Sequence, residues 1–240
     1  MQVETFSDRT EILLGRNALN ALASAKIAIF GLGGVGGWCA ESLARTGAER
    51  MTLVDPDDVC VTNVNRQTAA TTKTIGRPKA EALAERLVDI NPSLVADVRC
   101  TRYCAETAQE FDLSAFDYVI DAIDSLDDKA LLVSNALACP ETTLFSSMGA
   151  AFKTDPLQVR ASEFRKVEGD GLARALRQRF KKSGGIPAKR FTCVWSQERR
   201  AVAGPARPCG SIVHTTAVFG FALASLVVAD IIDRHSARST

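Results

Sequence analysis

Residues 26–36 read KIAIFGLGGVG, a short apolar run that stops at a cluster of glycines. The stretch 35–46, rich in Ala and Leu, follows and ends at Gly47. This order predicts a buried strand, a tight glycine turn and a helix closed by a glycine. Backbone N–H groups and the helix dipole at such a turn favour a bound phosphate. We therefore expect a nucleotide-binding turn here, rather than a turn that only packs a helix on a strand.

Strands and helices continue to alternate after this turn. Apolar runs predict strands at 51–54, 94–99, 118–120 and 143–145, and helices are expected at 78–90 and 127–138. This alternation predicts an α/β fold with a Rossmann-like, doubly wound and mainly parallel sheet. We expect a further buried helix near the C-terminus, at about 215–232.

The composition is typical of a folded protein. The chain has 240 residues, of which 46% are hydrophobic and 24% charged, so disorder is excluded. Its seven cysteines include no C-x-x-C pair, which argues against a disulfide framework or a zinc ribbon. The longest apolar run, 217–229, is shorter than a bilayer span. These features predict a cytoplasmic protein with no membrane segment.

Polar motifs follow the predicted strands. Asp55 ends the second strand, where a carboxylate can accept hydrogen bonds from ribose hydroxyls. Arg66 lies in NVNRQ (63–67), Lys79 in GRPK (76–79) and Asp124 in DAID (121–124). Nucleotidyl transfer needs cations near the departing pyrophosphate and a carboxylate for Mg²⁺, whereas hydride transfer does not. Each residue alone is also compatible with an ordinary surface or capping role.

Lys79 is expected in the first turn of a helix, where the dipole disfavours a cation. Its position therefore suggests an anion that it neutralises. We expect Lys79 to matter more to chemistry than to the fold.

Together these motifs resemble those of the ubiquitin-activating-like adenylyltransferases, which adenylate carboxylates. The resemblance implies ATP and Mg²⁺ as cofactors, with Arg66, Lys79 and Asp124 in catalysis and Asp124 as the metal ligand. It also implies that Arg9 reaches the ATP site of a partner subunit in a homodimer, although Arg16 is an alternative. The implied ATP-binding residues are Gly31, Gly33, Gly34, Gly36, Asp55, Asn63, Arg66, Gln67 and Lys79.

Within that superfamily, the chain resembles the tRNA threonylcarbamoyladenosine dehydratases over nearly its whole length. The segments that carry this resemblance include RTEILLG (9–15), VIDAIDS (119–125) and SSMGA (146–150). The resemblance implies ATP-dependent cyclisation, a dehydration, of N6-threonylcarbamoyladenosine at position 37 of tRNA through an acyl-adenylate intermediate. A large effective molarity would favour the ring closure.

Two other functions remain open. The first is an adenylyltransferase that activates the C-terminal Gly-Gly of a ubiquitin-like sulfur-carrier protein, although such members usually carry two zinc-binding C-x-x-C pairs. The second is a non-catalytic nucleotide-binding module or an NAD-dependent oxidoreductase, for which the glycine turn and Asp55 would suffice. A sulfur-relay accessory protein is a further candidate partner.

A basic helix is expected after Gly171. The net charge of the whole chain is +1, yet residues 160–207 hold 13 Lys and Arg against 4 acidic residues. The spacing of Leu172, Leu176 and Phe180 predicts a packing face. The face of Arg174, Arg177 and Lys181 is either solvated or binds tRNA phosphates. We expect an ATP-binding adenylation domain at 1–155, and a basic substrate-binding appendage at 156–240 whose C-terminal helix packs back on the core.

Overall fold

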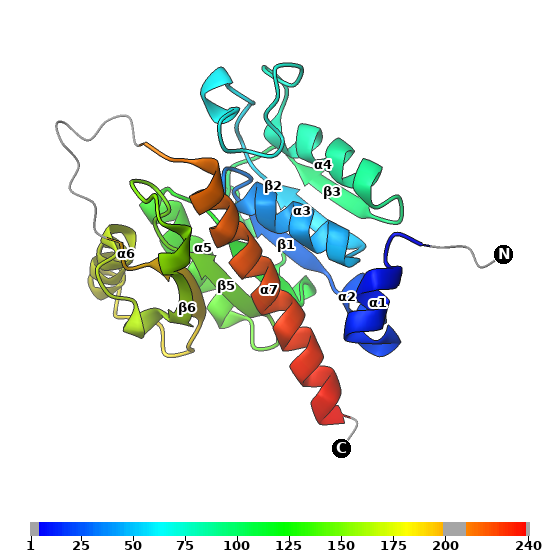
Figure 1. Ribbon diagram of the computed structural model, residues 1–240. Helices are drawn as coiled ribbons and strands as arrows, with labels where there is room; N and C mark the ends of the chain where they lie inside the picture. Colours follow the sequence, from blue (N-terminus) through cyan, green and yellow to red (C-terminus); the bar gives the residue numbers. More distant parts are fainter. Residues whose placement is uncertain (1–4, 199–209, 239–240) are drawn as a thin grey trace.

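A seven-stranded sheet forms the centre of the computed structural model, which describes residues 5–198 and 210–238 (Figure 1). The strand order is β3-β2-β1-β4-β5-β7-β6. All neighbouring strands are parallel except β6, which runs antiparallel to β7. The predicted Rossmann-like, mainly parallel sheet is therefore confirmed. The strands are β1 (Ile27–Phe30), β2 (Arg50–Val54), β3 (Val95–Arg99), β4 (Tyr118–Asp121), β5 (Thr143–Ser147), β6 (Val159–Glu163) and β7 (Thr192–Ser196).

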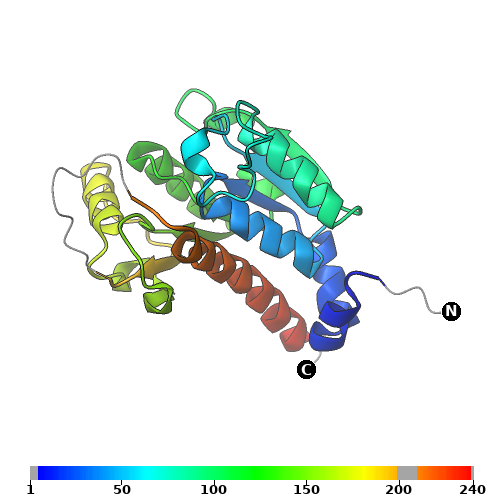
Figure 2. The ribbon, with the colours of Figure 1, turned by 45° about the horizontal axis from the view of Figure 1, so that its top comes forward.

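Helices cover both faces of the sheet, as a doubly wound fold requires (Figure 2). The side chains of β1 divide between two hydrophobic clusters, with Ile27 and Ile29 in one and Ala28 and Phe30 in the other. Residues of α3, α4 and α7 complete the first cluster, and residues of α5 and α6 complete the second. The helices are α1 (Asp8–Leu14), α2 (Arg16–Ser24), α3 (Gly36–Thr46), α4 (Lys79–Ile90), α5 (Leu126–Ala138), α6 (Gly171–Lys182) and α7 (Val213–Arg238).

Two strands, β6 and β7, were not expected from the sequence. The apolar part of β7 is only Cys193, Val194 and Trp195, and β6 is an edge strand with exposed Arg160 and Ala161. Neither segment gives the long apolar run or the clear alternation that marks a strand. Because β7 pairs with β5, segments from both sides of residue 155 share one sheet. The division of the chain into two domains at that residue stays a prediction.

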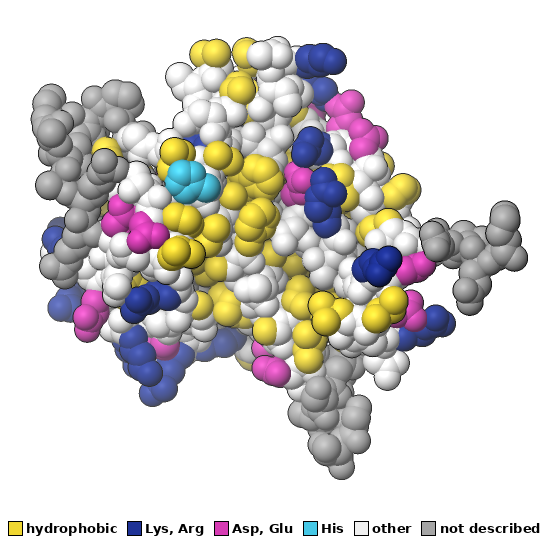
Figure 3. Space-filling view, in the orientation of Figure 1, with side chains coloured by type: hydrophobic (Ala, Val, Ile, Leu, Met, Phe, Trp, Pro, Cys, Tyr) yellow, Lys and Arg dark blue, Asp and Glu magenta, His cyan; other side chains and the backbone are white. Residues whose placement is uncertain are grey.

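The C-terminal helix α7 is longer than the expected helix at 215–232. The segment Val213–Arg234 of this helix has a mean hydropathy of 2.0, so by length and composition alone it could cross a membrane. Half of its most apolar window is buried in this fold, however, and Phe219, Leu223 and Val227 belong to the first cluster. Figure 3 shows hydrophobic side chains along this side of the molecule, and Phe221 of α7 is exposed. A core helix with one uncovered side accounts for these observations.

Gly220 lets α7 approach α3 closely. A Cβ atom at this position would lie 2.5 Å from the Val35 carbonyl oxygen and 2.8 Å from the Cys39 backbone nitrogen. These neighbours are backbone atoms of the glycine turn and of α3, which cannot move aside cheaply. The contact therefore fixes the distance between the two helices.

We predict that Gly220→Ala lowers the free energy of unfolding by about 2 kcal/mol, because the added methyl group overpacks the contact between α7 and α3. Urea titration followed by circular dichroism measures this change. Ser225→Ala is the matched control, because Ser225 is exposed on the same helix and its loss should change stability by less than about 0.5 kcal/mol. Equal stability of Gly220→Ala and wild type would contradict the predicted overpacking.

Candidate functional site

A cleft of about 1030 Å³ opens at the carboxyl ends of the parallel strands. It lies where the strand order reverses, between β1 and β4, which is the usual ligand crevice of this fold. Gly36 is not among the lining residues but lies beneath the turn. The predicted site residues that line the cleft are Gly31, Gly33, Gly34, Asp55, Asn63, Arg66, Gln67, Lys79 and Asp124.

The glycine turn at the cleft floor depends on the absence of side chains. Gly31 has a φ of +86°, and a Cβ atom there would lie 2.7 Å from the Ala122 carbonyl oxygen. A Cβ atom at Gly36 would lie 1.8 Å from the carbonyl oxygen of Gly31. No side chain caps the start of α3, so no side-chain acceptor competes there with a bound phosphate.

Asp55 braces this turn from the end of β2. Its Oδ2 accepts a hydrogen bond from the Leu32 backbone nitrogen at 2.6 Å, and its Oδ1 accepts one from the Asp57 nitrogen at 3.0 Å. Burial raises the pKa of Asp55, while the nearby Lys79 ammonium opposes this rise. Asp55 thus has a structural role in addition to the ribose contact expected from the sequence.

Lys79 is the first residue of α4, in the first helical turn as the sequence predicted, and its side chain is buried. Its Nζ lies 2.7 Å from Asp57 Oδ2 and 3.6 Å from Asp55 Oδ1. These two carboxylates supply the anion that the position of Lys79 suggested. Lys79 therefore contributes to the fold as well as carrying a positive charge into the cleft.

The segment after β2 brings three more predicted residues to the cleft. Asn63 Oδ1 accepts a hydrogen bond from the Cys60 nitrogen at 3.0 Å. Arg66 Nη1 donates to the Thr62 carbonyl oxygen at 2.8 Å, which holds the guanidinium at the cleft edge. Gln67 is buried, and its Oε1 has no hydrogen-bond partner among the described residues.

Asp124 is exposed in the loop after β4 and faces the cleft. Beneath it lies a buried network that the sequence did not indicate. Asp121 Oδ2 accepts hydrogen bonds from Lys129 Nζ at 2.7 Å and Ser146 Oγ at 2.6 Å, and its Oδ1 accepts one from the Ile123 nitrogen. The network fixes the loop that carries Asp124. Within residues 5–198 and 210–238, no group of three metal-ligating side chains is present.

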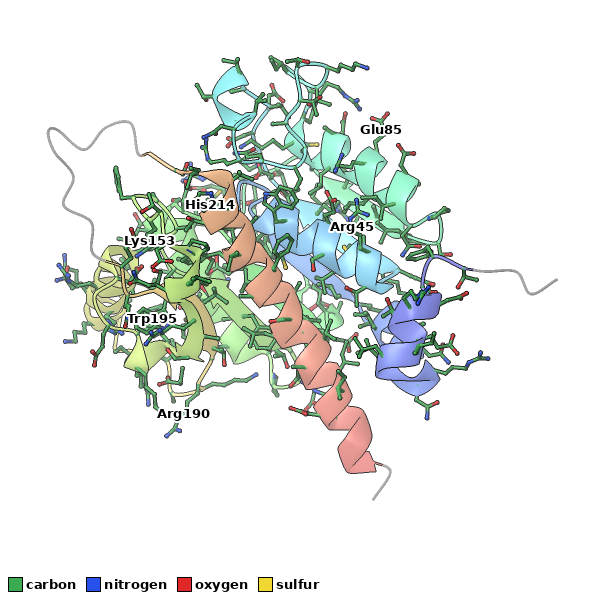
Figure 4. The ribbon with its side chains drawn as sticks, in the orientation of Figure 1. Arg45, Glu85, Lys153, Arg190, Trp195 and His214 are labelled. Carbon is green, nitrogen blue, oxygen red and sulfur yellow. The ribbon has the colours of Figure 1, made fainter. Side chains whose placement is uncertain are left out.

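The opposite wall of the cleft comes from residues 147–153 and 170–172. Lys153, labelled in Figure 4, is buried there. Its Nζ donates to the carbonyl oxygens of Ser196 at 2.9 Å and Glu198 at 3.3 Å. Burial lowers the pKa of Lys153, while Asp170 and Glu198 oppose this fall. Sequence reasoning did not select Lys153, although it lies only three residues after the SSMGA segment at 146–150.

Arg9 does not contribute to the cleft of its own chain. It is exposed on α1, which with α2 precedes the amino end of β1, whereas the cleft lies at the carboxyl end of that strand (Figure 1).

The basic helix α6 corrects one grouping made from the sequence. Arg174 and Lys181 are exposed, but Arg177 turns inward. Its guanidinium donates to the carbonyl oxygens of Phe164 and Val167 and lies over the Phe164 ring. The three cations therefore do not share one free face. Leu176 and Phe180 are buried as expected, whereas Leu172 is half-buried and lines the cleft.

Comparison with known proteins places these features in a family. The ThiF family model matches residues 8–238. The tRNA threonylcarbamoyladenosine dehydratase of Bacillus subtilis is 40% identical over 73% of this chain and 69% of its own. The Escherichia coli tRNA N6-threonylcarbamoyladenosine dehydratase, solved in complex with ATP, has a TM-score of 0.86 and 35% identity, covering 99% of this chain and 100% of that chain. A sulfur carrier protein adenylyltransferase of Thermus thermophilus is 30% identical over 59% of this chain and 51% of its own.

We predict that Lys79→Met lowers the free energy of unfolding by about 3 kcal/mol at pH 7, because it leaves the buried Asp55 carboxylate without its cation. Without the ammonium, the pKa of Asp55 rises further above its value in the unfolded chain. Between these two pKa values, the folded state binds a proton that the unfolded state lacks. The stability of the variant therefore falls as pH rises through that range. The loss should therefore be smaller at pH 5 than at pH 7.

Urea titrations at the two pH values measure these losses. Lys73→Met, which removes an exposed lysine, is the control and should change stability little at either pH. A loss for Lys79→Met that does not depend on pH would show that Asp55 does not sense the ammonium.

Proposed function

The chain belongs to the ThiF family, and we propose that it is an ATP-dependent tRNA threonylcarbamoyladenosine dehydratase. It would cyclise N6-threonylcarbamoyladenosine at position 37 of tRNA. The observation that carries this proposal is the cleft, which gathers the glycine turn, Arg66, Lys79 and Asp124 in a chain that matches dehydratases over most of its length. The sulfur-carrier adenylyltransferase match covers a smaller part of the chain, so that function is the weaker alternative.

The lining of the cleft fits ATP. The uncapped start of α3 can receive a phosphate, and Gln67 adds a polar side chain to the cleft lining beside it. Asp55 lies at the end of β2, where ribose hydroxyls are expected. Arg66 and Lys79 supply positive charge for the triphosphate, and we assign them to the charge that develops on pyrophosphate.

We assign Asp124 to a Mg²⁺ ion that accompanies the nucleotide. One carboxylate suffices for this role, because Mg²⁺ in nucleotide sites is held by one or two carboxylates together with phosphate oxygens and water. Such an ion would neutralise charge on the phosphates. The buried bonds of Asp121 keep the Asp124 loop in place.

The proposed reaction has two steps. A threonyl carboxylate oxygen attacks the α-phosphorus of ATP, and pyrophosphate leaves, which gives an acyl-adenylate. The ureido group of the same substituent then attacks the activated carbonyl carbon, AMP leaves and a five-membered ring closes. The proton on N6 of the adenosine is lost in this step. Because nucleophile and electrophile belong to one small substituent, the effective molarity is large and no enzyme nucleophile is required.

We propose that the tRNA backbone lies along the basic surface beside the cleft. Arg174 and Lys181 of α6 are exposed and suited to phosphate contacts, whereas Arg177 is held by backbone carbonyls. Lys189 is also engaged, since its Nζ donates to the carbonyl oxygens of Cys139 and Pro140. Further cations of this segment, Arg199, Arg200 and Arg207, lie outside the described residues.

Mass spectrometry of tRNA nucleosides, isolated under mild conditions, tests the proposed function. Incubation of the protein with ATP and tRNA that carries N6-threonylcarbamoyladenosine should remove one water from the nucleoside at position 37. The same tRNA should stimulate ATP–pyrophosphate exchange. An unchanged nucleoside, with exchange driven instead by a sulfur-carrier protein, would overturn the proposal in favour of the alternative.

We also propose that the protein is a cytoplasmic homodimer in which Arg9 completes the ATP site of the partner subunit. The exposed position of Arg9, outside its own cleft, supports this arrangement. Exposed apolar residues of α1 and α7, including Ile12, Leu13 and Phe221, offer a surface for a second copy.

Mixing two inactive variants tests the shared site. Arg9→Ala and Lys79→Ala chains, unfolded and refolded together, should regain about a quarter of wild-type activity, because half of the pairs are hybrids and each hybrid has one intact site. Arg16→Ala alone, at an exposed arginine nearby, is the control and should keep wild-type activity, which distinguishes the two arginines. No recovery in the first mixture would place Arg9 outside the partner's site.

A further inference from the structure

Two buried, oppositely charged side chains, Lys153 and Asp170, face each other in the wall of the cleft without a direct hydrogen bond. Lys153 Nζ lies 3.9 Å from Asp170 Oδ2, and both side chains are less than a tenth exposed. The Lys153 ammonium donates two hydrogen bonds, to the carbonyl oxygens of Ser196 and Glu198. Its third N–H has no partner within hydrogen-bond distance among the described residues.

Within the part of the chain that the structure describes, the Asp170 carboxylate likewise uses only one of its two oxygens as a hydrogen-bond acceptor. Its Oδ1 accepts a hydrogen bond from the Ala173 nitrogen at 2.9 Å, as the N-cap of α6, and a longer one from the Gly149 nitrogen at 3.5 Å. Its Oδ2 accepts none from the residues that the structure describes. Buried charges are costly when their hydrogen bonds are incomplete, so this pair offers one donor and one acceptor to a ligand in the cleft.

The geometry of the pair selects the chemistry of that ligand. A hydroxyl can accept a hydrogen bond from an ammonium and donate one to a carboxylate through the same oxygen atom. Two groups 3.9 Å apart can both reach one oxygen at ordinary hydrogen-bond distances. A carboxylate ligand would be repelled by Asp170, and an apolar group would leave both charges unsatisfied.

The surrounding structure holds the pair in place. Asp170 is fixed by its role at the start of α6. Lys153 is followed by Thr154 and Asp155, whose backbone nitrogens donate to the Glu198 carboxylate at 2.8 and 2.9 Å. Both residues line the same cleft as Lys79 and Asp124, which lie in the part assigned to ATP.

We propose that Lys153 and Asp170 bind the side-chain hydroxyl of the threonyl group and so select threonylcarbamoyl over analogues that lack it. This inference rests on the proposed function. Anchoring the hydroxyl would also restrict rotation of the substituent and direct its carboxylate towards the α-phosphate, since hydroxyl and carboxylate are carried by adjacent carbons. Lys153 and Asp170 are thus specificity and positioning residues.

The test compares two synthetic anticodon stem-loops, which carry threonylcarbamoyl-adenosine or glycylcarbamoyl-adenosine at position 37. The glycyl substrate has the same carboxylate and ureido group but no hydroxyl. Wild-type protein should prefer the threonyl substrate by about ten- to a hundredfold in kcat/KM. This ratio corresponds to the free energy of a hydrogen bond to a charged group. Lys153→Met should reduce this preference to about threefold or less, mainly by lowering kcat/KM for the threonyl substrate.

Asp170→Asn provides a second variant, because asparagine is as good a helix N-cap as aspartate but has lost the carboxylate. It should also reduce the preference, with wild-type ATP affinity, although loss of the carboxylate beside the buried Lys153 ammonium should lower thermal stability. Lys166→Met, at an exposed lysine of the same region, should keep the wild-type preference.

Equal use of the two substrates by wild type would overturn the inference while leaving the proposed function intact. The same holds if both Lys153→Met and Asp170→Asn keep the full preference, which would assign the space between them to a structural water. Failure of wild type to cyclise the threonyl substrate would instead refute the proposed function.

Discussion

The close approach of backbone segments around the glycine turn is the constraint on which the rest of the structure depends. The end of β1, the start of α3, the loop after β4 and helix α7 all meet there, at distances that leave no room for a Cβ atom at Gly31, Gly36 or Gly220. The conformation of the glycine turn is therefore set by packing between elements and does not depend on a ligand. Because Asp55 also accepts a hydrogen bond from Leu32, the turn is fixed before nucleotide arrives.

Buried ion pairs also fix the loops that carry the candidate site residues. Asp121 and Lys129 are fully buried, and Ser146 and the Ile123 nitrogen use the remaining acceptor sites of the carboxylate. Such pairs are tolerated only when further hydrogen bonds offset the loss of hydration. The loops after β2 and β4 therefore have few alternative positions. Charged groups held in fixed positions can stabilise a transition state without reorganisation.

The sequence predicted the parallel part of the sheet and the residues that gather around the glycine turn of the cleft, because both have local signatures. The run at 27–30 is continuously apolar, and the glycines follow at once. By contrast, the inward turn of Arg177 depends on Phe164 and Val167, which come from a different segment. Helical spacing could not reveal that contact. The sequence likewise did not predict the burial of Lys153, because this burial depends on β7, a strand that the sequence did not predict.

The two walls of the cleft come from different parts of the chain, and this separation has a functional consequence. The wall that we assign to ATP uses the strand ends and loops between Gly31 and Asp124, whereas the opposite wall uses 147–153 and 170–172. Relatives that adenylate a carrier protein can share the first wall, because activation of any carboxylate places the same demands on the triphosphate. Under the proposed function, we assign substrate choice to the second wall, since a shared fold does not by itself determine function. A buried donor and acceptor in that wall discriminate more sharply than an apolar surface, because a substrate that lacks the matching group leaves both unsatisfied.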